Sequence, residues 1–234
     1  MCGPPHAGGR PEPTIYERGY EPVVDDPGLP RVLLIGDSIS EGYTFPVRQA
    51  LRGKANVHRI ATNARHSRRG LSLLDTWLGD GNWDVVHFNF GLHDVSRTYP
   101  VNGVKVAHDQ TRVPPDEYGR NLREVVARLR ATGAVTIWAS TTAVPPRPPG
   151  PGRRNEDVVR YNRVAANVMR ELGVPVNDLY ELSRQKLRDN GRTGRHDVHF
   201  DDDGYLSLGT QVAAAIAATL NHLPGTNDPE RKDV

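Results

Sequence analysis

The sequence predicts an α/β protein, a three-layer α/β/α sandwich around a five-stranded, mainly parallel sheet. Two observations favour this fold class. Short apolar runs rich in β-branched or aromatic residues alternate with amphipathic stretches, and two of those stretches stop at a glycine. Buried strands joined by helices form a parallel sheet with right-handed crossovers and helices on both faces.

The five expected strands are short apolar runs. They cover Arg31–Ile35, Val57–Ala61, Asp84–Asn89, Ala134–Ala139 and Val174–Asn177. Ligands of such sheets bind outside the carboxyl ends of the strands, so the loops after these runs are where function is expected.

The expected helices carry end signals. The stretch Asp116–Thr132 follows two prolines and stops at Gly133, and Asn155–Leu172 stops at Gly173. Both place apolar residues three and four apart, as a helix packed on one side requires. We also expect helices over Leu71–Leu78 and over the Ala-rich stretch from about Gly204 to Leu220.

One domain is expected, over residues 30–223. Residues 1–29 are rich in Gly and Pro and lack periodicity, which is typical of an extended arm or a disordered segment, and residues 224–234 are expected to form a disordered tail. A 37% hydrophobic and 25% charged composition is ordinary for a globular protein of this size.

Charge and cysteine content exclude several classes of function. Thirty basic against 28 acidic residues leave a net charge of +2, which gives no general case for binding nucleic acid or membranes. The single cysteine, Cys2, cannot form an internal disulfide.

The N-terminus has no apolar stretch typical of a signal peptide, so a cytoplasmic protein is expected, with secretion left open. The oligomeric state is not predicted.

A serine follows the first expected strand directly. Gly36-Asp37-Ser38 places a hydroxyl at the strand's carboxyl end, where glycine permits a sharp turn and the following amides can stabilise an oxyanion. Taken alone, the motif also fits a turn in which a polar side chain caps the next helix.

Two later blocks make the pattern specific. Gly91-Leu92-His93-Asp94 follows the third strand, and His196-Asp197-Val198-His199 precedes the last helix. This order of blocks resembles the SGNH hydrolases, or GDSL-like esterases and lipases, over about residues 31–220. The resemblance implies a flavodoxin-like fold and a serine esterase without metal or other cofactor. Its nucleophile would be Ser38 and its general base His199.

The resemblance also implies an oxyanion hole. Its donors would be the Ser38 amide, the Gly70 amide at the start of the Leu71–Leu78 helix, and the side chain at position 93. The family usually has Asn there, but His93 can still donate one N–H group. In the implied mechanism, a neutral imidazole takes the proton of the serine hydroxyl as the serine oxygen attacks the ester carbonyl, which gives an acyl-enzyme.

The expected triad carboxylate is Asp197. The family usually places it three residues before the histidine, where this chain has His196, while Asp197 lies two before. Residues two apart share a face of an extended chain, so Asp197 can reach His199; a Ser–His pair oriented by a backbone carbonyl is the alternative.

Other polar residues near these blocks are expected to support the site. Asp37 and Asp94 are interpreted as acceptors of backbone N–H groups, and Asn63 as a cleft or turn residue. The basic cluster Arg65–Arg69 opposes the dipole of the helix that it precedes, which indicates either a solvated rim or a grip on an acidic substrate. The proline loop Pro145–Gly152 is expected to form one wall of the cleft.

The expected substrate is a small acyl ester, acetyl esters of carbohydrate above all, since no apolar lid is evident. Two alternatives stay open. One is a catalytically impaired carbohydrate-binding or interaction protein, favoured by His93 and the displaced Asp197. The other is a metal hydrolase using ligand types among His93, Asp94, His196, Asp197 and His199, although their spacing matches no metal motif. The first strand is not followed by a glycine-rich nucleotide-binding loop.

Overall fold

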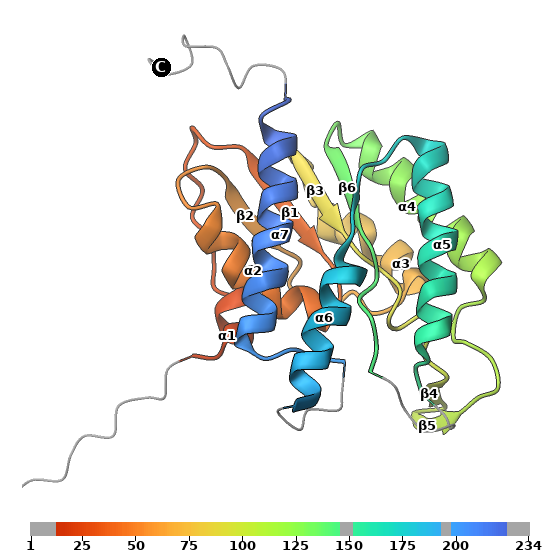
Figure 1. Ribbon diagram of the computed structural model, residues 1–234. Coiled ribbons are helices and arrows are strands. Elements are labelled where there is room, and N and C mark those ends of the chain that lie inside the picture. The colour runs from red at the N-terminus through yellow and green to blue at the C-terminus, as the bar shows by residue number, and fades with distance from the viewer. Residues whose placement is uncertain (1–12, 146–151, 193–197, 224–234) are drawn as a thin grey trace, which may run out of the picture.

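The computed structural model describes residues 13–145, 152–192 and 198–223, and its centre is one five-stranded sheet (Figure 1). The order of the strands is β2-β1-β3-β6-β7, and all neighbouring pairs run parallel. Counted along the chain this order is 2-1-3-4-5, which is the flavodoxin-like arrangement. The predicted sheet is therefore confirmed. Its strands are β1 (Arg31–Ile35), β2 (Asn56–Arg59), β3 (Val85–Phe88), β6 (Val135–Ala139) and β7 (Val176–Asn177).

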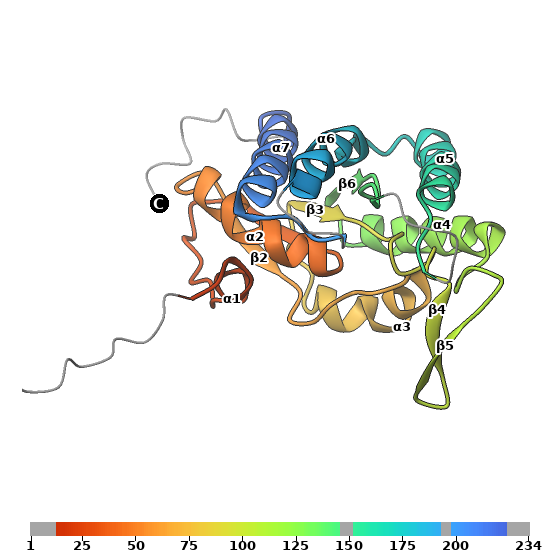
Figure 2. The same cartoon turned by 60° about the horizontal axis from the view of Figure 1, so that its bottom comes forward.

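Helices cover both faces of the sheet, which confirms the predicted three layers. On one side α2 (Ser38–Ala50) packs against α7 (Asp202–Leu220), and α7 also contacts β3 and β6. On the other side α4 (Pro115–Ala131) contacts both α3 (Ser67–Leu78) and α5 (Asn155–Leu172). Figure 2 shows α6 (Leu179–Arg192) and α7 on one side of β3 and β6, with α3 and α4 on the other.

The sheet positions the site through its register. Ile35 at the end of β1 pairs with Phe88 at the end of β3, and Phe88 pairs with Trp138 of β6. All three side chains are at most 1% exposed. The loops that leave these strands, which begin at Gly36, Asn89 and Ser140, therefore start side by side at one edge of the sheet.

The structure adds elements that the sequence did not predict. Helix α2 begins at Ser38 itself and contains Pro46, and α6 follows β7. An antiparallel hairpin of β4 (Thr98–Val101) and β5 (Val104–Ala107) turns at Asn102–Gly103, both with positive φ, and projects from the sheet in Figure 2.

A further short helix, α1 (Ile15–Gly19), lies inside the N-terminal stretch that was expected to be extended. Thr14 and Glu17 form a capping box at its start. The hydroxyl of Tyr16 hydrogen-bonds that of Tyr205 in α7, so residues 13–29 include a folded segment that packs on the domain. The rest of the expected arm and the expected tail at 224–234 lie outside the described residues.

Candidate active site

Ser38 is the first residue of α2, at the turn that leaves β1. The preceding Asp37 is the N-cap: its backbone is extended, and its Oδ1 accepts the Ile39 amide at 3.0 Å. Asp37 is only 2% exposed, and burial raises the pKa of its carboxyl. The cap fixes the turn and sets the half-buried Ser38 hydroxyl at the helix N-terminus, where amides lack intrahelical acceptors.

His199 reaches the same point from the other end of the domain. Its Nε2 lies 2.9 Å from Ser38 Oγ, across 161 positions of sequence. The two residues beside it, Val198 and Phe200, are buried, and Asp201 caps α7 by accepting the Gly204 amide at 2.9 Å. Buried neighbours and a capped helix hold the imidazole in place. The distance is within the reach that proton transfer requires.

Arg59, the last residue of β2, supports the turn between β1 and Ser38. The sequence alone did not indicate this role. The Arg59 side chain is 1% exposed, and its Nη2 donates to the Gly36 carbonyl at 3.2 Å and to Ser40 Oγ at 2.9 Å. Glu41 lies 3.6 Å away as its acidic partner. An arginine at a strand end carries no motif, so only the folded structure relates it to Ser38.

The segment Gly91–Asp94, which follows β3, packs against the loop after β6 and the start of α3. At Gly91 a Cβ would lie 1.8 Å from Thr141 Oγ1, so only glycine permits this close approach of the chain to the next loop. Asp94, which is fully buried, accepts the Ser67 amide at 3.0 Å and the Ser67 hydroxyl at 2.6 Å. The carboxyl thus accepts both hydrogen bonds from the first residue of α3, whose N-cap is His66.

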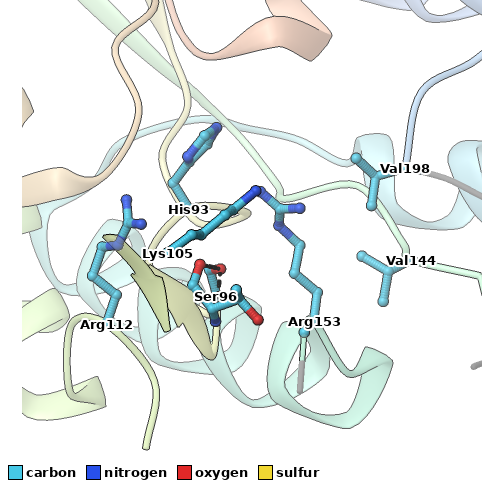
Figure 3. A pocket seen from close by; sticks show the side chains of 9 residues that line it. His93, Ser96, Lys105, Arg112, Val144, Arg153 and Val198 are labelled. Carbon is cyan, nitrogen blue, oxygen red and sulfur yellow. Dashed lines mark hydrogen bonds between the residues drawn. The ribbon is translucent and has the colours of Figure 1, made fainter. Parts of the chain in front are cut away.

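The half-buried His93 lines a cavity together with Val198, the residue that directly precedes His199 (Figure 3). Burial, and then the charges of Arg153 and Arg112, lower the pKa of His93 to about 3. The imidazole is therefore neutral near pH 7, where it can donate one N–H group.

Gly70 requires a correction. The Gly70 amide donates to the His66 carbonyl at 3.0 Å, and a Cβ at this residue would lie 2.3 Å from the Phe90 ring. Helix α3 begins at Ser67 rather than at Leu71, so Gly70 lies inside the helix and its amide is already used. The residue serves close packing on Phe90, and we remove it from the expected oxyanion hole.

The remaining expected site residues divide into two groups. Asn63 accepts the Arg65 amide at 2.9 Å through its Oδ1, which makes it a turn residue beside a left-handed Arg65 (φ 57°). Asp197 and His196 lie outside the described residues. Across residues 13–145, 152–192 and 198–223, no three His, Cys, Asp or Glu side chains gather as a metal site would require.

The cavity beside His93 has a volume of about 300 Å³. It takes residues from several loops at the strand ends, among them Val198, which directly precedes His199. Figure 3 shows the side chains of Lys105, Arg112 and Arg153 around it. Sequence reasoning named none of these cations, since they come from three separate segments.

The fold and the known relatives of the chain define the class of protein. It is a carboxylic ester hydrolase of α/β architecture. The model of the GDSL-like Lipase/Acylhydrolase family matches residues 34–206, well over half of the sequence. The chain therefore belongs to this family, as the three sequence blocks predicted.

Individual relatives agree with that placement. The isoamyl acetate-hydrolyzing esterase 1 homolog of Mus musculus is 26% identical over 220 residues, which cover 83% of this chain and 84% of the relative. The crystal structure of the acetyl xylan esterase AlAXEase has a TM-score of 0.65 at 14% identity and covers 80% of this chain and 99% of its own. The acetylxylan esterase Axe2 from Geobacillus stearothermophilus has a TM-score of 0.63 at 19% identity, with 83% and 95% covered. At these identities the two structures show the fold alone.

Within the described residues, no helix has the length and apolar character needed to cross a bilayer.

Proposed function

We propose that the protein is a serine esterase that hydrolyses small acyl esters, with Ser38 as nucleophile and His199 as general base. One observation carries the proposal: Ser38 Oγ and His199 Nε2 lie 2.9 Å apart at the carboxyl edge of the sheet. A serine hydroxyl is a weak nucleophile unless a neighbouring base takes its proton, and a serine and a histidine within hydrogen-bond reach are the signature of that chemistry.

The reaction follows from this geometry. As Ser38 Oγ attacks the carbonyl carbon, His199 Nε2 takes the hydroxyl proton and then passes it to the leaving alcohol. The acyl group is now on Ser38. A water molecule, deprotonated by His199, attacks the acyl carbon, and the proton returns to Ser38 as the acid leaves.

During the attack, negative charge develops on the carbonyl oxygen of the substrate, and hydrogen-bond donors must stabilise it. The Ser38 amide occupies the first position of α2, and no described residue accepts its hydrogen bond. With His93 as a second donor, the hole would consist of the serine amide and a neutral imidazole. Each well-placed donor contributes roughly 3–4 kcal/mol to lowering the barrier. We keep Asp197 as the proposed third member of the triad.

The proposed substrates are acetyl esters, O-acetylated carbohydrate in particular. Support comes from the names of similar proteins, two acetylxylan esterases and a homolog of an isoamyl acetate-hydrolyzing esterase. The cavity of about 300 Å³ is at the lower end of the range of roughly 300–1,000 Å³ found for ligand pockets, which favours a small substrate.

Replacing Ser38 by alanine tests the proposal. We expect Ser38→Ala to lower the kcat/KM for p-nitrophenyl acetate by at least about 10³-fold, since the variant has no nucleophile, and to leave the circular dichroism spectrum unchanged. The control is Ser72→Ala, at an exposed serine of α3 that bonds only its own helix, which should retain full activity.

A fluorophosphonate probe separates the esterase from a catalytically impaired binding protein. The wild-type protein should be labelled at Ser38, and Ser38→Ala should not be labelled. Equal turnover by Ser38→Ala and wild type would contradict the proposed nucleophile. A folded wild-type protein that neither reacts with the probe nor turns over ester would support the binding-protein alternative.

A further inference from the structure

Arg59 carries a buried charge beside the turn that leads to Ser38. Its side chain is 1% exposed, and the guanidinium group of an arginine stays protonated in proteins. Burying such a charge is unfavourable unless hydrogen bonds and opposite charge offset the loss of water. The groups that surround Arg59 therefore indicate what its charge stabilises.

One nitrogen of the guanidinium holds the loop after β2. Arg59 Nη1 donates to the Ile60 carbonyl at 2.7 Å and to the Thr62 carbonyl at 3.3 Å. Because the guanidinium is planar and rigid, these two bonds also fix the direction of its second nitrogen, Nη2. That nitrogen faces the turn after β1, where it donates to the Gly36 carbonyl.

The second nitrogen also contacts the residues on both sides of Ser38. Arg59 Nη2 lies 3.4 Å from the Asp37 carbonyl oxygen and 2.9 Å from Ser40 Oγ. The Ser40 hydroxyl in turn donates to the same Asp37 carbonyl at 2.7 Å. The Asp37 carbonyl thus accepts one hydrogen bond directly from Arg59 and another that Arg59 supports through Ser40.

This carbonyl belongs to the same peptide unit as the Ser38 amide. In a planar trans peptide the C=O and N–H bonds point in opposite directions, so the donors that hold the Asp37 carbonyl also set the direction of the Ser38 N–H group. Hydrogen bonds to the carbonyl polarise the peptide and make its N–H group a stronger donor. The Ser38 N–H group is the proposed oxyanion donor.

The acidic neighbour of Arg59 does not take these hydrogen bonds away from the turn. Glu41 Oε1 lies 3.6 Å from Arg59 Nη2, farther than the acceptors of the turn, and it accepts the Tyr20 hydroxyl at 2.7 Å. The Tyr20 ring covers the guanidinium, with Arg59 Cζ 4.8 Å from the ring centroid. An aromatic face stabilises a cation without competing for its N–H groups as a carboxylate would.

We propose that Arg59 is a positioning residue for catalysis, which acts through the Asp37 carbonyl and Ser40 to hold the Ser38 amide in the direction that stabilises the oxyanion. This inference rests on the proposed esterase function and deepens it. The oxyanion exists in the transition state and not in the bound ester. Loss of Arg59 should therefore lower kcat and leave KM nearly unchanged.

Two substitutions of Arg59 test the proposal. Arg59→Met removes the charge and every donor, and Arg59→Lys keeps the charge but cannot bond both loops in the same geometry. We expect Arg59→Met to lower kcat for p-nitrophenyl acetate about 10- to 100-fold, with KM changed about twofold or less, and Arg59→Lys to retain more activity. The rate at which the fluorophosphonate probe labels Ser38 should fall in the same order.

The matched control is Arg31, which makes the same kinds of contact at the other end of β1. Its Nε donates to Asp25 at 2.8 Å, and its Nη1 donates to the Asn82 carbonyl at 3.2 Å. Its Cζ lies 4.2 Å from the centroid of the Trp83 ring. Arg31 is the first residue of β1, whereas Ser38 follows the end of that strand. Arg31→Met should therefore change kcat by about twofold or less, whatever it does to stability.

Ser40→Ala tests the link between Arg59 and the Asp37 carbonyl with a smaller change of structure. We expect a loss in kcat of about tenfold or less, again with KM nearly unchanged, and Ser72→Ala is the control. Because Ser40 and Arg59 act on one carbonyl, the double variant with Arg59→Met should lose less activity than the product of the two single losses.

Circular dichroism and urea unfolding show whether each variant is folded in the assay. If folded Arg59→Met has the kcat of Arg31→Met, or if its loss is entirely in KM, Arg59 serves stability alone and the inference is wrong. If Arg59→Met does not fold, Arg59→Lys and Ser40→Ala decide, and wild-type kcat in both would overturn the inference. All these outcomes require an active wild type. A wild-type protein that neither hydrolyses the ester nor is labelled at Ser38 would instead contradict the esterase proposal, and this inference with it.

Discussion

Asp94 shows how one residue links protonation to folding. Its carboxyl is buried, and its hydrogen bonds from the Ser67 amide and hydroxyl offset only part of the cost of burying the charge. The pKa of Asp94 is raised from 3.8 to about 7. Between these two values the folded state holds a proton that the unfolded state has lost. The stabilising contribution is therefore fully present below pH 3.8 and is lost as the pH rises through 7.

Asp94→Asn should remove this pH dependence. An amide does not titrate here, and its oxygen can still accept the Ser67 amide. From pH 5 to pH 8 the free energy of unfolding of the wild type should therefore fall by about 2–3 kcal/mol relative to that of the variant, at about 1.4 kcal/mol per pKa unit. Urea unfolding at several pH values measures it, with the exposed Asp116→Asn as control. Parallel curves for wild type and Asp94→Asn would contradict the assignment.

The sequence alone identified candidate site residues correctly placed beside one another only where the residue type itself carries the chemistry. Ser38 and His199 are named by their motifs, and the structure places them together. Gly70 was misassigned because α3 begins at Ser67, earlier than expected, so that the Gly70 amide already donates within the helix. The position of this helix start depends on a tertiary contact, the hydrogen bond from the Ser67 amide to Asp94. Arg59 and Arg112 have no local pattern, and their roles depend on what the fold brings beside them.

At the level of elements, the packing of α2 on α7 sets the geometry of the site. Helix α2 begins at Ser38, and α7 begins three residues after His199. The two helices approach closely because glycines face the contact. A Cβ at Gly42 would lie 2.3 Å from the Tyr205 ring, and one at Gly209 would lie 2.5 Å from Cβ of Pro46. These small residues thus hold the nucleophile and the base at their separation.

Gly209→Ala should disturb both stability and catalysis. The added methyl also meets the Tyr43 carbonyl at 3.1 Å, so the helices must move apart, at a cost of about 1–3 kcal/mol in unfolding free energy. A shift of the helices moves His199 relative to Ser38, so kcat for p-nitrophenyl acetate should fall about tenfold or more. Urea unfolding and steady-state kinetics measure the two effects.

The control is Gly119→Ala in α4. Its new Cβ would lie 3.2 Å from Cγ1 of Val164 and in ordinary contact with the side chains of Arg123 and Val168, and alanine is the better helix former by about 1 kcal/mol. Gly119→Ala should therefore keep its activity and a similar stability. If Gly209→Ala is as active as this control, the glycine contact does not set the catalytic distance.

Elements with clean periodicity and end signals were predictable from the sequence, and interrupted ones were not. Helix α5 was predicted at Asn155–Leu172, as observed, because its apolar face is regular and Gly173 ends it in the left-handed conformation. Helix α2 was missed, since Gly42 and Pro46 disfavour a helix locally. Both are buried against α7, so tertiary packing outweighs their poor propensity.

For the whole molecule, the alternation of strands and helices was enough to predict the sheet and its three layers, since chain chirality leaves few ways to connect parallel strands. The charge of the cavity was not predictable. A net charge of +2 averages over the surface, whereas Lys105, Arg112 and Arg153 meet only after the hairpin and two loops have folded.

The site also depends on the complete domain. Ser38 follows the first strand and His199 precedes the last helix, 161 positions apart, and both segments are anchored in one core that includes Val198 and Phe200. A fold whose described residues share one hydrophobic core is expected to unfold in one cooperative step. We therefore expect activity and secondary structure to be lost together as urea is raised.

The test follows p-nitrophenyl acetate hydrolysis and far-UV circular dichroism in the same urea series, in the wild type and in the stability control Gly119→Ala. The two probes should give one midpoint in each protein, and both should shift together if the variant changes stability. If activity disappears well before the circular dichroism signal, the segment around His199 opens locally, with a lower free energy than global unfolding. The buried neighbours of His199 would then not be enough to hold the base at the serine.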